Sequence, residues 1–273
     1  MVQKAERLGG RTGTGRPLGN VTRGTTAANR MRRVDRWIAG TQAGRLRAAG
    51  PAPLAVDLGY GASPATAVEL FRRLRTVRPD ARLTGLEIEP GRVERARAAA
   101  EEGLDFRLGG FELPVDGHPV LVRAFNVLRQ YEESDVDAIW STLRARLAPG
   151  GLIVEGTCDE IGRRAAWVGI GAEGPETFSL ALRFGAFGLP SDVAERLPKA
   201  LIHRNVPGEP VHSFLRAADA AWLAAAPLAS FGNRQRWIRM CESLRGTGWP
   251  VLHGPARWRL GELTVDWACV APA

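Results

Sequence analysis

Residues 54–64 read Leu-Ala-Val-Asp-Leu-Gly-Tyr-Gly-Ala-Ser-Pro, and residues 84–90 read Thr-Gly-Leu-Glu-Ile-Glu-Pro. The apolar run before Gly59 predicts a buried strand, and Ser63 followed by Pro64 is typical of a helix start. Gly59 and Gly61 lack a Cβ atom, so a ligand can approach the backbone of the turn that they form. This strand, turn and helix predict a loop that binds a nucleotide-like ligand.

The acid before the glycines indicates which ligand the loop favours. The carboxylate of Asp57 would repel a pyrophosphate, whereas S-adenosylmethionine (SAM) brings a sulfonium and an ammonium that a carboxylate attracts. The third glycine of a dinucleotide fingerprint is missing, because Pro64 stands in its place. Glu87 ends a second predicted strand, residues 82–86, where a carboxylate can accept hydrogen bonds from ribose hydroxyls. The pattern therefore favours SAM over NAD. The alternative to a ligand-binding loop is that Gly59 and Gly61 are spaced in this way by chance in a chain of 32 glycines, and that Asp57 and Glu87 only cap loops.

In order and spacing these segments resemble the class I SAM-dependent methyltransferases. Asn126, after a fourth predicted strand at residues 119–125, and Pro149-Gly150-Gly151, before a fifth, extend the resemblance over residues 50–160. The fold that it implies is α/β, a doubly wound, mostly parallel sheet with a C-terminal antiparallel hairpin, expected at residues 257–270. The resemblance implies that the cofactor contacts Asp57, Gly59, Tyr60, Gly61, Glu87, Ile88, Gly110, Phe111 and Asn126.

Two of these positions have a plainer alternative. Many relatives of this fold carry an acid where Gly110 stands, and that acid meets the adenine amino group. Glycine leaves only backbone contacts and stacking by Phe111, and Phe111 could equally be an ordinary buried aromatic residue.

Charge is concentrated at the N-terminus of this 273-residue chain, whose formal net charge is +8. Residues 1–47 hold eleven of the 37 basic side chains and two of the 29 acidic ones, so the rest of the chain is nearly balanced. Residues 1–24 are rich in Gly, Thr and Arg, which predicts a flexible basic arm that is solvated or that binds phosphates. Three widely spaced cysteines, with no long apolar run, predict a cytoplasmic protein without disulfides or membrane spans.

Beyond the arm, residues 25–273 are expected to form one domain. A leading helix is expected at residues 25–50, and substrate-covering insertions at residues 163–245. Those insertions comprise a hairpin of residues 165–170 and 177–182, then helices near residues 191–200, 212–226 and 233–245.

Candidates for a catalytic base are few, because a sulfonium already carries an activated methyl group. Tyr131, Glu155, Asp159 and Glu160 lie near predicted strand ends, and His203 and His212 lie in the expected cover; ordinary structural roles are the alternative for each. Cys158 follows Thr157 as in RNA cytosine C5-methyltransferases, but the Pro-Cys signature that accompanies such a cysteine is absent. The acids Asp159 and Glu160 have no second pair to complete a metal site, so no metal is expected.

The interpretation is thus a SAM-dependent methyltransferase with a small-molecule acceptor and no membrane partner. Residues 126–131 do not carry the Asn/Asp-Pro-Pro-aromatic signature of base N-methylation. Two alternatives stay open: an RNA methyltransferase that uses the arginine-rich arm, and a non-catalytic SAM-binding or scaffold protein.

Overall fold

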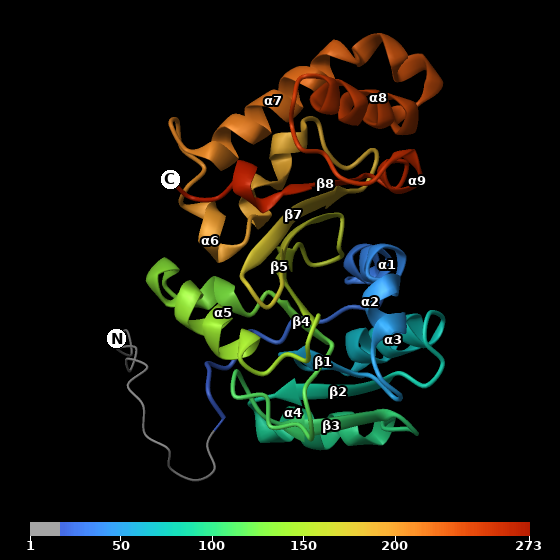
Figure 1. Cartoon of the computed structure of the whole chain (residues 1–273), viewed down its shortest axis with the longest axis vertical. Helices are drawn as coiled ribbons and strands as arrows, with labels where there is room; N and C mark the ends of the chain where they lie inside the picture. The colour runs from blue at the N-terminus through green and yellow to red at the C-terminus, as the bar shows by residue number, and fades with distance from the viewer. Residues whose placement is uncertain (1–16) are drawn as a thin grey trace.

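A computed structural model describes residues 17–273 of the chain. One sheet of eight strands runs through the molecule in the order β3-β2-β1-β4-β5-β6-β7-β8 (Figure 1). β1 to β5 pair in parallel, and β6 to β8 continue the sheet in antiparallel pairs. The strands are β1 (Leu54–Leu58), β2 (Arg82–Glu87), β3 (Leu104–Leu108), β4 (Leu121–Phe125), β5 (Leu152–Cys158), β6 (Arg164–Ile170), β7 (Pro175–Leu182) and β8 (Glu262–Asp266).

Helices cover both faces of the sheet, so its central strands are buried along their whole length. One face packs against α1 (Arg32–Thr41), α2 (Ala43–Ala48), α3 (Ala65–Arg75) and α4 (Pro90–Ala96). The other face packs against α5 (Val136–Arg144), α6 (Lys199–Ile202), α7 (Pro210–Ala224), α8 (Asn233–Gly246) and α9 (Pro255–Trp258). This arrangement confirms the predicted fold class, a doubly wound, mostly parallel sheet with an antiparallel C-terminal part.

Helix α1 is fixed to the sheet at two points. The indole Nε1 of Trp37 donates to Thr264 Oγ1 in β8 at 3.1 Å, inside the protein. The carboxylate of Asp35 accepts a hydrogen bond from Arg123 in β4, and both side chains are buried. These contacts hold the segment that precedes α1 close to the carboxyl ends of the parallel strands.

Three expected elements differ in the structure. The leading helix begins only at Arg32, because Asn29 adopts a φ of 62° and the residues before it are extended or in turns. The hairpin of β6 and β7 is confirmed, but it joins the sheet instead of covering it. The hairpin expected at residues 257–270 does not form: Pro255–Trp258 is helical, and β8 pairs with β7.

The helices between residues 17 and 273 are all too short or too polar to span a lipid bilayer.

Candidate functional site

The glycine turn after β1 is tied to the end of β2. Gly59 and Gly61 have φ values of 71° and 88°, which favour glycine over any residue with a Cβ atom. The Gly59 amide donates to the Leu86 carbonyl oxygen at 2.7 Å, and the Gly61 amide donates to Glu87 Oε2 at 3.0 Å. The two segments singled out in the sequence therefore meet at the carboxyl ends of adjacent parallel strands, where α/β sheets bind ligands.

Glu87 is 1% exposed, and its carboxylate already has three donors. Besides Gly61, the backbone amide of Ile88 donates to Oε1 at 3.0 Å, and Arg92 Nη1 lies 3.4 Å from Oε2. A carboxylate can accept about four hydrogen bonds, so little capacity remains for a ligand while Arg92 stays in place.

Asp57, which was expected to attract a cationic ligand, has a partner inside the protein. Its side chain turns into the layer of α1 and α3, where it is 3% exposed. Arg123 donates to both carboxylate oxygens, from Nε to Oδ1 at 2.9 Å and from Nη2 to Oδ2 at 2.6 Å. The same guanidinium binds Asp35, whose pKa burial raises to about 6 against the lowering effect of Arg123. The Asp57 carboxylate is therefore already neutralised, so it is not free to attract a cationic ligand.

Residues 17–27, which we call the strap, lie across the carboxyl ends of the first strands. The Leu18 amide donates to Glu112 Oε2 at 2.8 Å, and the Phe111 amide donates to the Leu18 carbonyl at 2.9 Å. Further along, the Asn20 amide donates to the Tyr131 hydroxyl, and Arg92 Nη2 donates to the Thr22 carbonyl at 2.9 Å.

The strap's last turn closes on the glycine loop. The Ala62 amide donates to the Gly24 carbonyl at 3.0 Å, and Thr26 Oγ1 donates to the Tyr60 carbonyl at 3.1 Å. Part of the expected flexible arm, residues 17–24, is thus packed against the domain in this structure. Residues 1–16 of that arm lie outside the described residues.

The strap almost fills the cleft below it. The remaining cavity has a volume of about 20 Å³, room for roughly one water molecule. It is lined by Leu18, Gly19, Asn20 and Thr22 of the strap and by Leu58, Gly59, Glu87, Ile88, Gly109, Gly110, Phe111, Val127 and Tyr131. A Cβ atom on Gly110 would lie 1.9 Å from the Leu18 carbonyl oxygen, so glycine there is what lets the strap lie so close.

Of the nine residues expected to contact a cofactor, Gly59, Glu87, Ile88, Gly110 and Phe111 line this cleft. Gly61 bonds Glu87 at its edge, while Tyr60 turns its ring onto Phe106 at 5.3 Å between centroids. Asn126 has a φ of 58° at the end of β4 and accepts a hydrogen bond from the Cys158 amide at 3.0 Å. Asp57 and Asn126 therefore hold the strand ends together and are not among the lining residues.

The six candidate bases do not gather in one place, and Asp159 and Glu160 lie beyond the carboxyl end of β5. Tyr131 lies in the cleft, where burial raises the pKa of its hydroxyl. Glu155 is fully buried in β5, residues 17–273 offer no partner for either of its carboxylate oxygens, and burial raises its pKa to about 8. His203 lies beside Lys199, and His212 beside Asn205, and neither histidine lines the cleft.

Cys158 is 1% exposed, and its sulfur contacts Met31 and Asn126. Burial raises the pKa of this thiol, so it is a poor thiolate nucleophile. The Asp159 carboxylate accepts hydrogen bonds from the backbone amides of Ile161, Arg163 and Arg164. Within the described part of the chain, no group of three or more His, Cys, Asp or Glu side chains is arranged to hold a metal ion.

Sequence reasoning missed Arg123 and the strap. Arg123 interrupts the apolar strand Leu121–Phe125, and a charge at a buried strand position signals a buried partner. The strap gave no such signal, because its contacts are made mostly by backbone groups.

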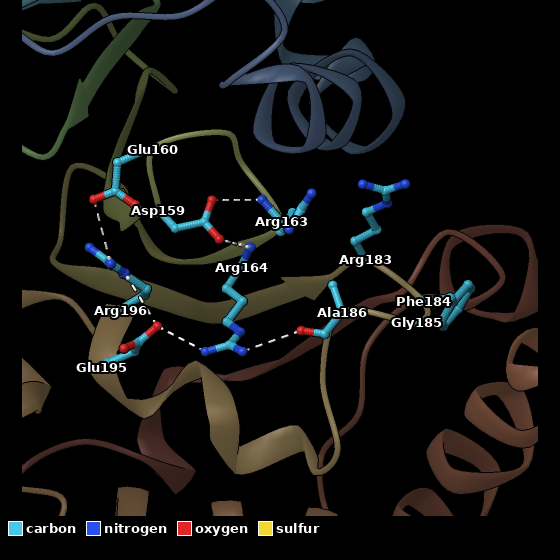
Figure 2. A pocket seen from close by; sticks show the side chains of 10 residues that line it. All are labelled: Asp159, Glu160, Arg163, Arg164, Arg183, Phe184, Gly185, Ala186, Glu195 and Arg196. Atoms are coloured by element: carbon cyan, nitrogen blue, oxygen red, sulfur yellow. Dashed lines mark hydrogen bonds and ion pairs between the residues drawn. The ribbon is translucent and has the colours of Figure 1, made fainter.

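A second, larger cavity lies beyond the carboxyl end of β5 (Figure 2). It has a volume of about 630 Å³ and is bounded by residues 159–164, the end of β7 and the 3₁₀ segment Pro190–Arg196. Four arginines line it: Arg163, Arg164, Arg183 and Arg196.

No protein-family model and no curated protein matches the chain. Solved structures that resemble it share the fold only in part. A magnesium protoporphyrin IX methyltransferase from Synechocystis PCC 6803 is 20% identical over 46% of this chain and 52% of its own, with a TM-score of 0.35. A SAM-bound amino pentose methyltransferase from Micromonospora echinaspora is 21% identical over 54% of this chain and 67% of its own, with a TM-score of 0.34. A pericyclic reaction enzyme is 18% identical over 41% and 28%, with a TM-score of 0.32.

Proposed function

We propose that the protein is a SAM-dependent methyltransferase whose acceptor is a small molecule. The observation that carries this proposal is the meeting of the glycine turn with the buried carboxylate of Glu87 in a cleft at the carboxyl ends of β1 and β2. A nucleoside at this place would lie against glycine backbone, with its ribose at Glu87 and its base between Gly110 and Phe111.

The fit depends on the strap. A cavity of about 20 Å³ holds no nucleoside, so the strap has to leave the cleft when the cofactor binds. Arg92 links departure of the strap to cofactor binding, because it contacts both Thr22 of the strap and Glu87. When Thr22 moves away, Arg92 loses one of the partners that hold its guanidinium beside Glu87. Movement of Arg92 off Glu87 would then leave Oε2 with capacity for a ribose hydroxyl.

SAM, when bound, supplies a methyl group that is already activated for transfer. The chain's own residues then have to place the acceptor in line with that group and exclude water. Of the six candidate bases only Tyr131 lines the cleft, and its raised pKa opposes deprotonation near neutral pH. We therefore propose an acceptor atom that is nucleophilic without a base from the protein.

One observation favours the non-catalytic alternative. A cleft that its own strap fills is also what a scaffold protein would have if it no longer exchanged a cofactor. An enzyme requires that SAM displace the strap, whereas a scaffold protein that no longer exchanges a cofactor does not.

The test is SAM binding by calorimetry, measured on the whole chain and on a chain that lacks residues 1–24. We expect Glu87→Gln to weaken binding about tenfold or more, through the loss of a charged acceptor. Glu94→Gln is the matched control, because it removes the same charge from an exposed site on α4. The cofactor site is wrong if neither chain binds SAM, or if Glu87→Gln binds SAM as tightly as the unmodified chain. Transfer from methyl-tritiated SAM to a cell extract then distinguishes an enzyme from a scaffold.

A further inference from the structure

The three carboxylates that line the second cavity already have hydrogen-bond or ion-pair partners within the protein. Asp159 is held by three backbone amides of its own turn. Glu195 pairs with Arg164 at 2.9 Å and lies 3.7 Å from Arg196 (Figure 2). Glu160 also lies 3.7 Å from Arg196. Glu160 and Glu195 therefore pair with Arg164 and Arg196, while Asp159 is bound by backbone amides alone. The lining has four arginines and three carboxylates, so its positive charges are in excess.

Arg163 and Arg183 form no ion pair with any residue in the described part of the chain. They come from different elements, the turn before β6 and the end of β7, yet Figure 2 shows both side chains pointing to the same side, toward the blue helix α1. Two unpaired guanidinium groups thus share one wall of the cavity.

A third guanidinium approaches from α1. Arg33 donates from Nε to the Gly162 carbonyl at 3.0 Å and from Nη1 to the Leu260 carbonyl at 3.2 Å, and it forms no ion pair with a carboxylate of the residues that the structure describes. Burial lowers the pKa of Arg33, and the charges of Arg36 and Arg183 lower it further, while the nearby carboxylate of Glu262, which is paired with Arg257, opposes them. Like charges that converge in this way repel one another unless an anion lies among them.

The size and form of the cavity indicate a small molecule. A volume of about 630 Å³ falls within the range of small-molecule sites, roughly 300–1,000 Å³. Guanidinium groups bind carboxylates and phosphates through paired hydrogen bonds, so an oxyanion is the ligand that such a wall favours.

The cavity is next to the proposed cofactor cleft. Val127 lines the cleft, and its neighbour Asn126 contacts Cys158, whose own neighbour Asp159 lines the cavity. The path from Val127 to Asp159 thus covers two steps along the backbone and one spacing between neighbouring strands. The two linings therefore lie on the order of 12 Å apart. A molecule held in the cavity by one end could reach the cleft with the other.

We propose that this cavity binds the carboxylate or phosphate group of the methyl acceptor, so that the substrate is a small anionic molecule. The inference rests on the proposed methyltransferase function. Arg163 and Arg183 hold the anionic end, and the methylated atom lies on the order of 12 Å away, beyond Asn126, at the edge of the cleft.

The first experiment needs no SAM. Binding of inorganic pyrophosphate and of citrate is measured by calorimetry for the whole chain and for Arg163→Gln/Arg183→Gln. Both side chains are exposed and unpaired, so the fold should stay intact. Arg47→Gln/Arg72→Gln is the control, because it removes two exposed charges elsewhere. We expect the cavity variant to lose at least about tenfold in affinity for one probe and the control to lose little. The better probe distinguishes a phosphate from a carboxylate site.

Equal affinity in the cavity variant and the control would overturn the anion site. A single-stranded RNA of 20 nucleotides is the third probe: RNA binding that depends on Arg163 and Arg183, with no binding of either small anion, would assign the surface to RNA instead.

The second experiment concerns the acceptor. A cell extract is divided on an anion-exchange resin before incubation with methyl-tritiated SAM, and label is expected in the retained, anionic fraction. Label only in the unretained fraction would refute an anionic acceptor. Anion binding without SAM binding would instead keep the arginine site and reject the methyltransferase function, so the two failures are distinct.

Discussion

Arg123 donates to both carboxylate oxygens of Asp57, at 2.9 Å and 2.6 Å, and the two side chains are 1% and 3% exposed. The acid that stands before the glycine turn is therefore a structural residue that joins β1 to β4. Through Asp35 the same arginine also fixes α1, and with it the end of the strap.

Replacement of Arg123 by methionine should destabilise the fold strongly. The change leaves Asp35 and Asp57 buried without a counter-charge, and loss of one partner of a buried ion pair costs about 3–5 kcal/mol. Denaturant unfolding measures this loss, with Arg97→Met, at an exposed ion pair, as the control of small effect. If Arg123→Met unfolds at the same denaturant concentration as the unmodified chain, the buried triad is not a determinant of stability.

Removal of residues 1–24 should speed SAM association and tighten its binding by about tenfold, because the cofactor no longer competes with the strap for the cleft. Removal of residues 1–16 keeps the strap, so it should change the association rate and the affinity for SAM only slightly. Stopped-flow mixing gives the association rates. Weaker binding after removal of residues 1–24 would mean that the strap holds the cofactor instead of excluding it.

Gly110→Ala should expel the strap without shortening the chain. The added Cβ atom would meet the Leu18 carbonyl at 1.9 Å, whereas a Cβ atom on Gly44 would meet nothing within 4 Å. We expect faster hydrogen exchange at the amides of Leu18 and Asn20 in Gly110→Ala, and unchanged exchange in Gly44→Ala. Unchanged exchange in both variants would show that the strap is not held by this close approach.

Glu155 should make stability fall with rising pH. Burial raises its pKa from 4.5 to about 8, so the folded state holds a proton that the unfolded chain releases above pH 4.5. The contribution is fully present below pH 4.5 and is lost, at up to about 1.4 kcal/mol per pH unit, as pH rises to about 8.

Glu155→Gln removes this titration, so its stability relative to the unmodified chain should increase between pH 5 and pH 8. Urea unfolding at several pH values measures the difference. Two parallel pH profiles would show that Glu155 is not protonated in the folded protein.

Cys158 should resist alkylation. Burial raises the pKa of both thiols, that of Cys269 to about 11, so access of the reagent decides which reacts first. Cys158 is 1% exposed, whereas Cys269 is only partly buried. Treatment with iodoacetamide at pH 8, followed by peptide mass analysis, should label Cys269 well before Cys158. Rapid labelling of Cys158 in the folded protein would reopen a role as a nucleophile.

Local patterns predicted most of the parallel half of the sheet. Strands need continuous apolar runs, and helices need caps and apolar stripes, so β1 to β5 and the hairpin of β6 and β7 were visible in the sequence. The antiparallel C-terminal part was predicted correctly, but its placement as a local hairpin at residues 257–270 was wrong. β8 pairs with β7, some eighty residues earlier, and no local pattern encodes that pairing.

The sequence by itself determined that an acidic strand, a glycine turn and a second acid follow one another at a spacing that brings them to the same sheet edge. Only the tertiary structure decided what those groups do, because a side chain's role depends on partners far away in the chain. Asp57 is neutralised by Arg123, Glu87 is shared with Arg92, and the cleft is closed by backbone groups of residues 17–27. Every residue carries the same backbone groups, so hydrogen bonds made by the backbone of residues 17–27 could not be predicted from residue types.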